Sequence, residues 1–235
     1  MKTLLSTTYC GPVQWYQKLY RSEEVLMERQ ETFQKQTYRN RCVIATTNGL
    51  QTLTVPVERS SSNLIKDIRI SNHGNWRHQH WFALMSAYNE SPFFDYYQDD
   101  FRPFYERQYD FLYDFNMEIC HKVCELIDIQ PNIKETTFYR SAGVQEFRSE
   151  DNCSKPQNLK TSRPHSTNLS TRQLVNSSTE IIDLRSSINP KHPVADADFV
   201  ARRYYQVYER KHGFQPNLSI IDLLFNMGPE SIFWL

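Results

Sequence analysis

The chain of 235 residues carries 27 Lys and Arg residues against 27 Asp and Glu residues, so its formal net charge is zero. This balance argues against a dedicated DNA- or RNA-binding protein, which would carry a basic excess or stripe. The six glycines stand at positions 11, 49, 74, 143, 213 and 228, a spacing that excludes the GxGxxG, P-loop and GxSxG motifs. The length favours one domain over the whole chain.

Neither a membrane span nor a signal peptide is indicated by the sequence. The longest apolar run, Trp81–Met85, is far shorter than the roughly 20 residues that cross a bilayer. Residues 1–10 lack the apolar core of a signal peptide. The five cysteines are irregularly spaced in a chain too long to need disulfides, so we expect a reduced, cytoplasmic protein.

The first predicted elements are a strand over Thr3–Thr8, a helix over Val13–Tyr20 and a strand over Glu24–Glu28. Next comes the clearest local signal, in which two β-rich runs, Cys42–Thr46 and Leu50–Val57, flank Asn-Gly. Asn-Gly readily supplies positive φ at both central residues of a type I′ turn, so we predict a β-hairpin with that turn.

A further strand is predicted over Ile65–Ile70, where apolar and polar residues roughly alternate. In the next two segments the apolar residues recur at helical spacing, which predicts helices. The first set is Trp81, Leu84, Met85 and Tyr88, and the second is Leu112, Phe115, Ile119, Val123 and Leu126. Pro92 and Pro103 punctuate the aromatic stretch between them, so we expect at least two helices, with most of the aromatic residues in the core.

Arg148–Thr179 differs in kind, because 15 of its 32 residues are Ser, Thr or Asn. We predict a mobile polar insert, which is either a solvated loop or a lid. A strand over Glu180–Leu184 follows, then a helix from Asp196 or Asp198 through Tyr208 that closes near Gly213.

A last short helix is predicted over Ser219–Phe225. Because strands and helices intermix along the chain, the predicted class is α/β, with mixed α+β as the alternative. We expect a mixed sheet with a β-hairpin, flanked by helices.

Several blocks of sequence, taken together, resemble a known family. Lys35–Arg41 (Lys-Gln-Thr-Tyr-Arg-Asn-Arg) precedes Leu53–Val57 (Leu-Thr-Val-Pro-Val), and Trp76–Trp81 and Leu218–Gly228 extend the pattern. Apart from the polar insert, almost the whole chain resembles the WbqC-like family, especially its Bacteroidetes-type members.

This resemblance implies a role in surface-polysaccharide or related small-molecule biosynthesis, because the family takes its name from a gene in an O-antigen cluster. Many members begin with a His-Gln-Pro junction between strand and helix, similar to the His motifs of nucleotidylyltransferases. The corresponding stretch, Leu5–Tyr9, has no histidine. This departure speaks against nucleotidyl transfer.

The family pattern matches Lys35, Tyr38, Asn40 and Arg41, and Arg39 lies between them. Arg offers a planar fork and Lys a point charge, so this segment is a candidate clamp for an anionic substrate. The alternative is a solvated basic face beside the hairpin. We expect Arg41 to lie in a cleft with a carboxylate or an incoming anion as its partner.

His80 is a candidate general acid or base, because the pKa of histidine ordinarily lies near neutrality. The alternative is a structural histidine. His78 and His80 are two residues apart at the start of a predicted helix, so their side chains point in different directions. We therefore expect no His-x-His metal site. Cys120 and Cys124 share one face of a predicted helix, but zinc needs two more ligands and the sequence offers no obvious second pair. We therefore predict that both cysteines are core residues and that no metal binds there.

Asp222 and Asn226 interrupt an apolar run at i, i+4 spacing, and buried polar groups must be hydrogen-bonded. In one interpretation, Ser219 caps the helix and Asp222 at N3 completes a box-like arrangement. The alternative is that Asp222 is catalytic and Asn226 binds substrate.

Two functions of different classes follow. The first is a transferase-type enzyme acting on an anionic sugar or nucleotide-sugar-like substrate, held by Lys35 and Arg41, with His80 or Asp222 as acid or base. The second is a non-catalytic binding or scaffold protein of a biosynthetic gene cluster. Convergence of the candidate residues on one pocket favours the enzyme, and dispersal favours the scaffold. The sequence indicates no cofactor and leaves the oligomeric state open.

Overall fold

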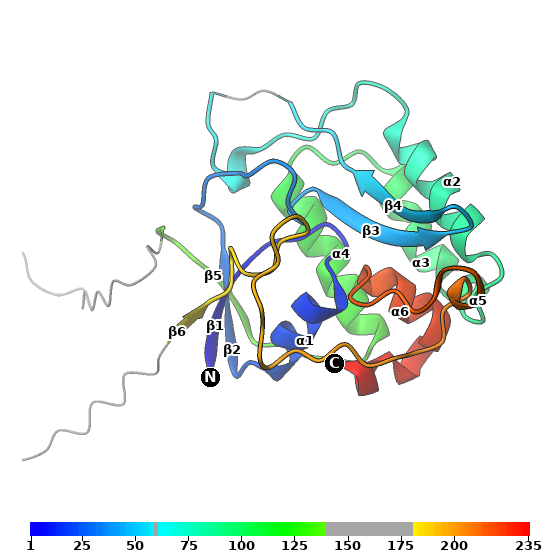
Figure 1. Cartoon of the computed structure of the whole chain (residues 1–235). Helices are drawn as coiled ribbons and strands as arrows, with labels where there is room; N and C mark the ends of the chain where they lie inside the picture. Colours follow the sequence, from blue (N-terminus) through cyan, green and yellow to red (C-terminus); the bar gives the residue numbers. More distant parts are fainter. Residues whose placement is uncertain (59–60, 140–180) are drawn as a thin grey trace, which may run out of the picture.

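The computed structural model describes residues 1–58, 61–139 and 181–235, so the predicted polar insert Arg148–Thr179 lies outside the described part. Within that part the chain has a four-stranded parallel sheet, a two-stranded antiparallel hairpin and six α-helices (Figure 1). The predicted α/β class is confirmed. The parallel sheet lies at one end of the molecule, and the hairpin tip with α2 and α5 lies at the other.

The parallel sheet has the strand order β5-β2-β1-β6. Its strands are β1 (Lys2–Ser6), β2 (Glu24–Glu28), β5 (Ile133–Glu135) and β6 (Ile181–Asp183). In the register of the central strands, Thr3 of β1 pairs with Val25 on one side and with Ile182 on the other. β1 and β2 are buried along most of their length, which explains their nearly continuous apolar sequence.

The predicted hairpin is confirmed as β3 (Arg41–Thr46) paired with β4 (Gly49–Thr54). The predicted type I′ turn is wrong. Type I′ needs positive φ at both central residues, but among Thr47, Asn48 and Gly49 only Gly49 has positive φ, at 107°. One glycine with positive φ after the turn residues is the pattern of a type I turn with a glycine bulge.

The helices of the described residues are α1 (Val13–Arg21), α2 (Trp76–Tyr88), α3 (Phe94–Glu106), α4 (Leu112–Leu126), α5 (Glu209–His212) and α6 (Ile220–Met227), with 3-10 helices η1 (Ile65–Asp67) and η2 (Gly228–Trp234). The helices predicted around Val13–Tyr20, Leu112–Leu126 and Ser219–Phe225 are therefore confirmed. None of these helices is long and apolar enough to cross a bilayer.

Between the hairpin and α4, one prediction is wrong and the expectation of at least two helices is confirmed. Ile65–Ile70 begins with η1 instead of forming a strand, because Ile65 and Ile68 are three residues apart and both are buried by one 3-10 turn. Pro103 lies inside α3 and does not end it. As predicted, most of the aromatic residues there are core, although Tyr96 is 73% exposed.

The predicted helix from Asp196 or Asp198 through Tyr208 is also wrong. This segment forms no helix before α5, and Asp196 instead accepts hydrogen bonds from Lys18 Nζ and Gln14 Nε2 of α1 at 2.9 and 2.8 Å. The segment is thus held against α1 by the largely buried ion pair between Asp196 and Lys18. Gly213, with φ of 72°, does end α5 as expected.

Helix α6 forms the centre of the core. Its residues from Ile220 to Asn226 are all buried, and the ring of Phe225 contacts Tyr88, Phe94 and Phe101. Because α6 also contacts α1, α3 and β3, it joins the two ends of the molecule into one packed body.

Candidate functional site

Polar residues follow the parallel strands where their carboxyl ends meet at one edge of the sheet. β1 runs into Ser6-Thr7-Thr8, and β6 is followed by Arg185. The chain leaves β1 through α1 to pair as β2 on one side, while β6 pairs on the other side of β1. In open parallel sheets, ligands bind outside the carboxyl ends at such a switch point. This edge is therefore our candidate site.

A small pocket, which we call the sheet-edge pocket, opens there. It is lined by Ser6, Thr7, Thr8, Trp15, Tyr38, Arg39, Leu184, Arg185 and Ile188. Its volume of about 10 Å³ admits one water-sized group. A larger ligand would therefore lie across its mouth with one group inserted. Of the predicted site residues, Tyr38 lines this pocket, together with Arg39 of the same basic segment.

Arg39 is buried and held by Glu31. Its Nε donates to Glu31 Oε1 at 2.8 Å, and its Nη2 donates to Glu31 Oε2 at 2.5 Å and to Ser6 Oγ at 2.7 Å. Asn116 of α4 fixes the backbone by donating to the carbonyl oxygen of Arg39 at 2.7 Å. Such pairing is required because an unpaired buried guanidinium is costly.

Arg185 places a second guanidinium at the same pocket. Its Nε and Nη2 donate to the two carboxylate oxygens of Asp183 at 3.0 and 2.6 Å, and its Nη1 donates to Glu28 Oε2 at 3.2 Å. Burial acts to raise the pKa of Asp183, but the hydrogen bonds from Arg185 hold it below its ordinary value. The sheet thus brings together two arginines that are far apart in sequence.

Several donors at the sheet-edge pocket have no partner among the described residues. Thr8 Oγ1 is buried without a hydrogen bond. No described group bonds Arg39 Nη1, Thr7 Oγ1 or the hydroxyl of Tyr38. Burial raises the pKa of Tyr38, so its hydroxyl keeps the proton it can donate. A ligand with several acceptor oxygens would satisfy these groups together.

The amino end of α1 cannot serve as a second anion site in this arrangement. The amide of Val13 donates to the carbonyl of Leu218 at 3.0 Å, and the amide of Gln14 donates to Asn217 Oδ1 at 2.9 Å. A helix N-terminus binds anions through such amides when they are free. Here the segment before α6 already occupies them.

The other members of the basic segment lie elsewhere. Lys35 is exposed. Asn40 donates from Nδ2 to the carbonyl of Val55 at 2.9 Å and so ties the start of β3 to the end of β4. Arg41 is half-buried, its Nε has no hydrogen-bond partner, and no carboxylate among the described residues pairs with it. Of the two partners that we expected for Arg41, the carboxylate is absent from the described residues.

His80 lies in the core and lines none of the described pockets. Its Nδ1 is 3.0 Å from the hydroxyl of Tyr9, which also lies 2.9 Å from the hydroxyl of Tyr105. Burial lowers the pKa of His80 to about 4, with a hydrogen bond to the backbone of Thr54 acting the other way. His80 is therefore neutral at pH 7. It reaches the sheet-edge pocket only indirectly, because the amide of Tyr9 donates to the carbonyl of Tyr38 at 2.8 Å.

Asp222 lies in a different part of the core. It accepts hydrogen bonds from the hydroxyls of Tyr88 and Tyr204 at 2.9 and 2.7 Å and from Gln206 Nε2 at 3.3 Å. Burial raises the pKa of Asp222 to about 6, against these donors, which lower it. Asn226 donates from Nδ2 to the carbonyl of Asp222 at 2.7 Å.

The predicted cap of α6 is confirmed in part. Ser219 Oγ accepts from the amide of Ile221 at 3.4 Å, but the amide of Ser219 donates to the carbonyl of Val43 at 2.9 Å. Because the side chain of Asp222 bonds the two tyrosines and Gln206, it completes no box with Ser219. The box-like arrangement is wrong.

The sequence reasoning missed Ser6, Thr7, Thr8, Glu28, Glu31 and Arg185. One signal could have found part of this set, because Ser-Thr-Thr lies at the carboxyl end of the predicted strand Thr3–Thr8, where ligands bind if the sheet is parallel. Nothing local to Glu28 or Arg185 indicated their pairing across 157 residues. No three His, Cys, Asp or Glu side chains form a metal-binding cluster in the part of the chain that the structure describes.

Comparison with known proteins agrees with the family resemblance of these blocks of sequence. The model of the WbqC-like protein family matches residues 7–233. The chain belongs to the WbqC-like protein family. It is also similar to the uncharacterized protein Rv1507c of Mycobacterium tuberculosis (strain ATCC 25618 / H37Rv), with 27% identity over 213 residues, covering 89% of this chain and 86% of that protein. No solved structure matches the chain.

Proposed function

We propose that this WbqC-like protein binds the anionic group of a sugar or nucleotide-sugar-like substrate at the sheet-edge pocket. In this proposal it acts as a transferase-type enzyme in surface-polysaccharide or related small-molecule biosynthesis. The observation that carries the proposal is the buried, unpaired hydroxyl of Thr8 at the carboxyl edge of a parallel sheet, in a pocket that also presents Arg39 and the hydroxyls of Thr7 and Tyr38.

The two buried arginines support an anionic ligand. Both guanidiniums are already oriented by carboxylates, so binding needs little ordering of side chains. An oxygen of a phosphate or carboxylate would complete the hydrogen bonds of Arg39 and of the hydroxyls. Lys35 and Arg41 lie outside the pocket, so their predicted part in binding would be at a second group of the substrate.

One observation favours the non-catalytic alternative, a binding or scaffold protein. The predicted catalytic residues His80 and Asp222 line none of the described pockets and lie in separate buried networks. Their catalytic roles stay predictions. Tyr38 and Glu31 lie nearer the pocket, but Glu31 is engaged by Arg39.

The binding part of the proposal is tested by thermal unfolding with inorganic phosphate, nucleoside diphosphates and nucleotide sugars. A ligand at a hundred times its Kd adds about 2.7 kcal/mol to the free energy of unfolding. Thr8→Val keeps the shape of the side chain and removes the unpaired hydroxyl. The variant should be as stable as the wild type, or more stable by about 1 kcal/mol, and should lose the ligand response.

Thr8→Ser is the matched control, because it keeps the hydroxyl and should keep the response. An equal response in the Val and Ser variants would contradict the assignment of the pocket. Chromatography of nucleotide sugars incubated with the protein and with candidate acceptors then separates the two functions. Release of the nucleotide supports a transferase, whereas binding without turnover supports the scaffold.

A further inference from the structure

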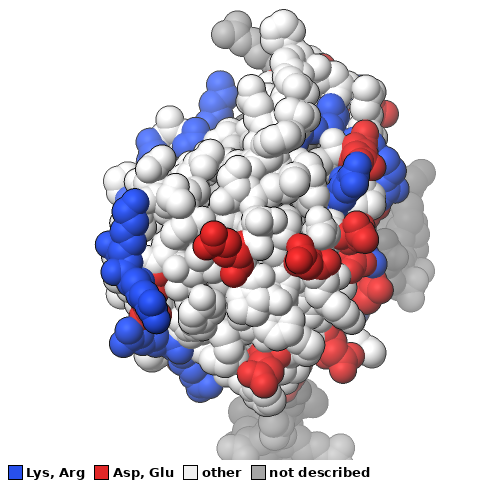
Figure 2. All heavy atoms as spheres, turned by 90° about the vertical axis from the view of Figure 1, so that its right-hand side faces the viewer, with Lys and Arg blue, Asp and Glu red and all other residues white. Residues whose placement is uncertain are grey.

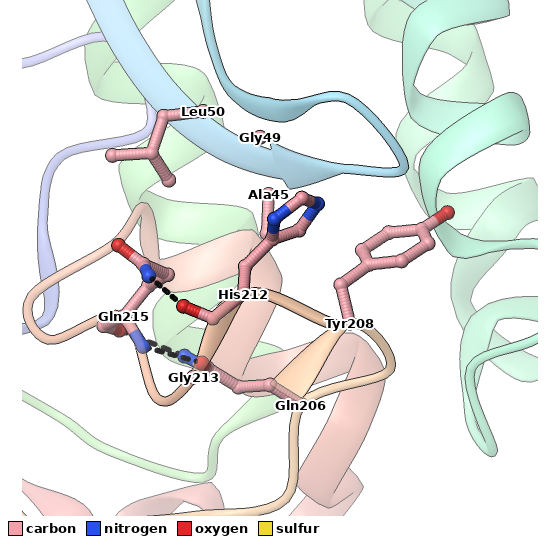
Figure 3. A pocket seen from close by; sticks show the side chains of 8 residues that line it. All are labelled: Ala45, Gly49, Leu50, Gln206, Tyr208, His212, Gly213 and Gln215. Carbon is pink, nitrogen blue, oxygen red and sulfur yellow. Dashed lines mark hydrogen bonds between the residues drawn. The ribbon is translucent and has the colours of Figure 1, made fainter. Parts of the chain in front are cut away.

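A second pocket, which we call the hairpin pocket, lies at the opposite end of the molecule (Figure 3). It has a volume of about 180 Å³. The hairpin supplies one wall and the segment around α5 supplies the other. Its lining residues are Ala45, Gly49, Leu50, Gln206, Tyr208, His212, Gly213 and Gln215.

No charged side chain lines the hairpin pocket. The side of the molecule that carries the hairpin tip and α5 shows scattered Asp and Glu side chains across its middle and lower part, with Lys and Arg along the left border and at the upper right (Figure 2). Lys211 lies close by, but its Nζ donates to the carbonyl of Thr47 at 2.7 Å. The pocket therefore suits a neutral ligand, because a charged group entering it would find no counter-ion.

Hydrogen bonds hold the walls in place. Gln206 pairs with the backbone of Gln215 in both directions, accepting from its amide at 2.9 Å and donating to its carbonyl at 2.8 Å. The same Nε2 of Gln206 donates to buried Asp222 at 3.3 Å. On the far wall, the hydroxyl of Tyr208 donates to the carbonyl of Ala87 at 2.9 Å. The pocket is thus formed before any ligand arrives.

Most of the polar atoms left without a partner on these walls are acceptors, the exception being the second N–H of Gln215 Nε2. His212 Nε2 lies 3.0 Å from the carbonyl of Thr47, which only accepts, so Nε2 carries a proton and Nδ1 is the ring nitrogen without a partner among the described residues. Gln215 donates its Nε2 to the carbonyl of His212 at 2.9 Å, which leaves Oε1 free (Figure 3). The hydroxyl oxygen of Tyr208 keeps its lone pairs. A matching ligand must therefore bring donors.

We propose that the hairpin pocket is a binding site for a neutral sugar ring. The hydroxyls of a sugar donate to His212 Nδ1 and Gln215 Oε1, and its C–H face packs on Leu50 and the ring of Tyr208. A nucleobase fits less well, because its ring nitrogens and carbonyls need several donors and these walls offer only the second N–H of Gln215 Nε2. The site is separate from the sheet-edge pocket and does not depend on the function proposed for it.

Saturation-transfer NMR with methyl glycosides of glucose, galactose and N-acetylglucosamine tests the proposal, with adenosine as the nucleobase probe. Leu50→Trp fills the pocket from an exposed hairpin position and should weaken sugar binding about tenfold or more. Gln51→Trp places the same ring on the neighbouring exposed residue and should leave binding within about twofold of the wild type. His212→Phe removes the acceptor but keeps an aromatic ring, and it too should weaken binding.

Saturation transfer to none of the glycosides would overturn the proposal, as would equal sugar binding in Leu50→Trp and Gln51→Trp. Transfer to adenosine alone would overturn the assignment of a sugar. Because the two pockets are separate, Thr8→Val should leave the glycoside signals unchanged. A failure at the sheet-edge pocket is thereby distinguished from a failure here.

Discussion

The sheet-edge pocket and the hairpin pocket offer different hydrogen-bonding chemistry. At the sheet-edge pocket, the groups without a described partner are Arg39 Nη1, which only donates, and the hydroxyls of Thr7, Thr8 and Tyr38, which can also donate. At the hairpin pocket they are mostly acceptors, and no charged side chain lines the walls. What a protein leaves unpaired therefore indicates the ligand more directly than what it has paired. Acceptor-rich anions suit the first pocket and donor-rich neutral molecules suit the second.

Burial sets the difference between them. Four buried charged side chains, Glu28, Glu31, Arg39 and Arg185, surround the sheet-edge pocket and satisfy one another. The hairpin pocket has amides and aromatic rings, with the single buried carboxylate of Asp222 behind them. Mutations that affect one chemistry and leave the other unchanged test whether the two pockets are independent.

The largest effect is expected for Asp222→Ala. The change leaves the hydroxyls of Tyr88 and Tyr204 and the amide of Gln206 without their acceptor, and it opens a cavity in the core. The free energy of unfolding should fall by about 4 kcal/mol, as measured by denaturant titration. Glycoside binding at the hairpin pocket should weaken because Gln206 is no longer held. An unchanged midpoint would show that this network contributes little.

Glu31→Gln tests the sheet-edge pocket. Arg39 loses its ionised partner while remaining buried, so the free energy of unfolding should fall by about 3 kcal/mol. The freed guanidinium should respond more strongly to phosphate, because the competing carboxylate is gone. Glu135→Gln is the control, since its ion pair with Arg29 is exposed and should change stability by less than about 1 kcal/mol. A weaker phosphate response in Glu31→Gln than in the wild type would contradict an anion site.

His80 lies in the core and should affect stability through pH. The pKa of His80 is about 4 in the folded protein, against roughly 6.5 when unfolded. Its stabilisation is therefore present above about pH 6.5 and is lost as the pH falls towards 4. The pKa of Asp222, raised to about 6, acts in the opposite sense, because its contribution is lost as the pH rises through 6. The two groups partly cancel in the same window.

His80→Phe removes one of these two titrations and keeps a ring beside Tyr9. The difference in unfolding free energy between wild type and variant should shrink by about 2–3 kcal/mol on going from about pH 7 to about pH 4.5. Chemical denaturation at the two pH values measures it. A constant difference would mean that His80 titrates normally. In that case it would again be a candidate acid or base for catalysis.

The smallest effect is expected at the hairpin pocket for Gly49→Val. A β-branched residue is strained at the φ of 107° found there, so the melting temperature should fall, with a cost of about 1–2 kcal/mol. Thr47→Val, at a neighbouring turn residue without positive φ, should change stability by less than about 0.5 kcal/mol. Equal stability of the two variants would contradict a strained glycine at this turn.

Strong local patterns in the sequence predicted much of the fold. Glu24–Glu28 matches the bounds of β2 because its apolar residues form one short run between glutamates, and Leu112–Leu126 matches α4 because its apolar residues recur at helical spacing. Asp196 misled the prediction, because a residue suited to capping a helix is equally suited to pairing with a buried lysine, Lys18. Which of the two occurs depends on the packing against α1, and the local sequence does not encode that choice.

The candidate site was predicted less well. The members of the predicted basic segment diverge: Arg39 lines the sheet-edge pocket, and Arg41 does not. The partners Glu28 and Arg185 meet only because β1 lies between β2 and β6 in the sheet. A pairing created by strand order has no local signature in the sequence.

The closure of the loop before α1 also constrains how the chain can fold as it is synthesised. The backbone groups of Cys10, Gly11 and Val13 form hydrogen bonds with Ser219, Ile220 and Leu218, respectively, about two hundred residues later in the chain. Because translation proceeds from the amino end, the polar backbone groups of this loop stay hydrated until α6 has left the ribosome. Contacts of such long sequence separation form slowly, because a long loop must close first. Folding of the newly made protein should thus finish only after nearly all of it has emerged.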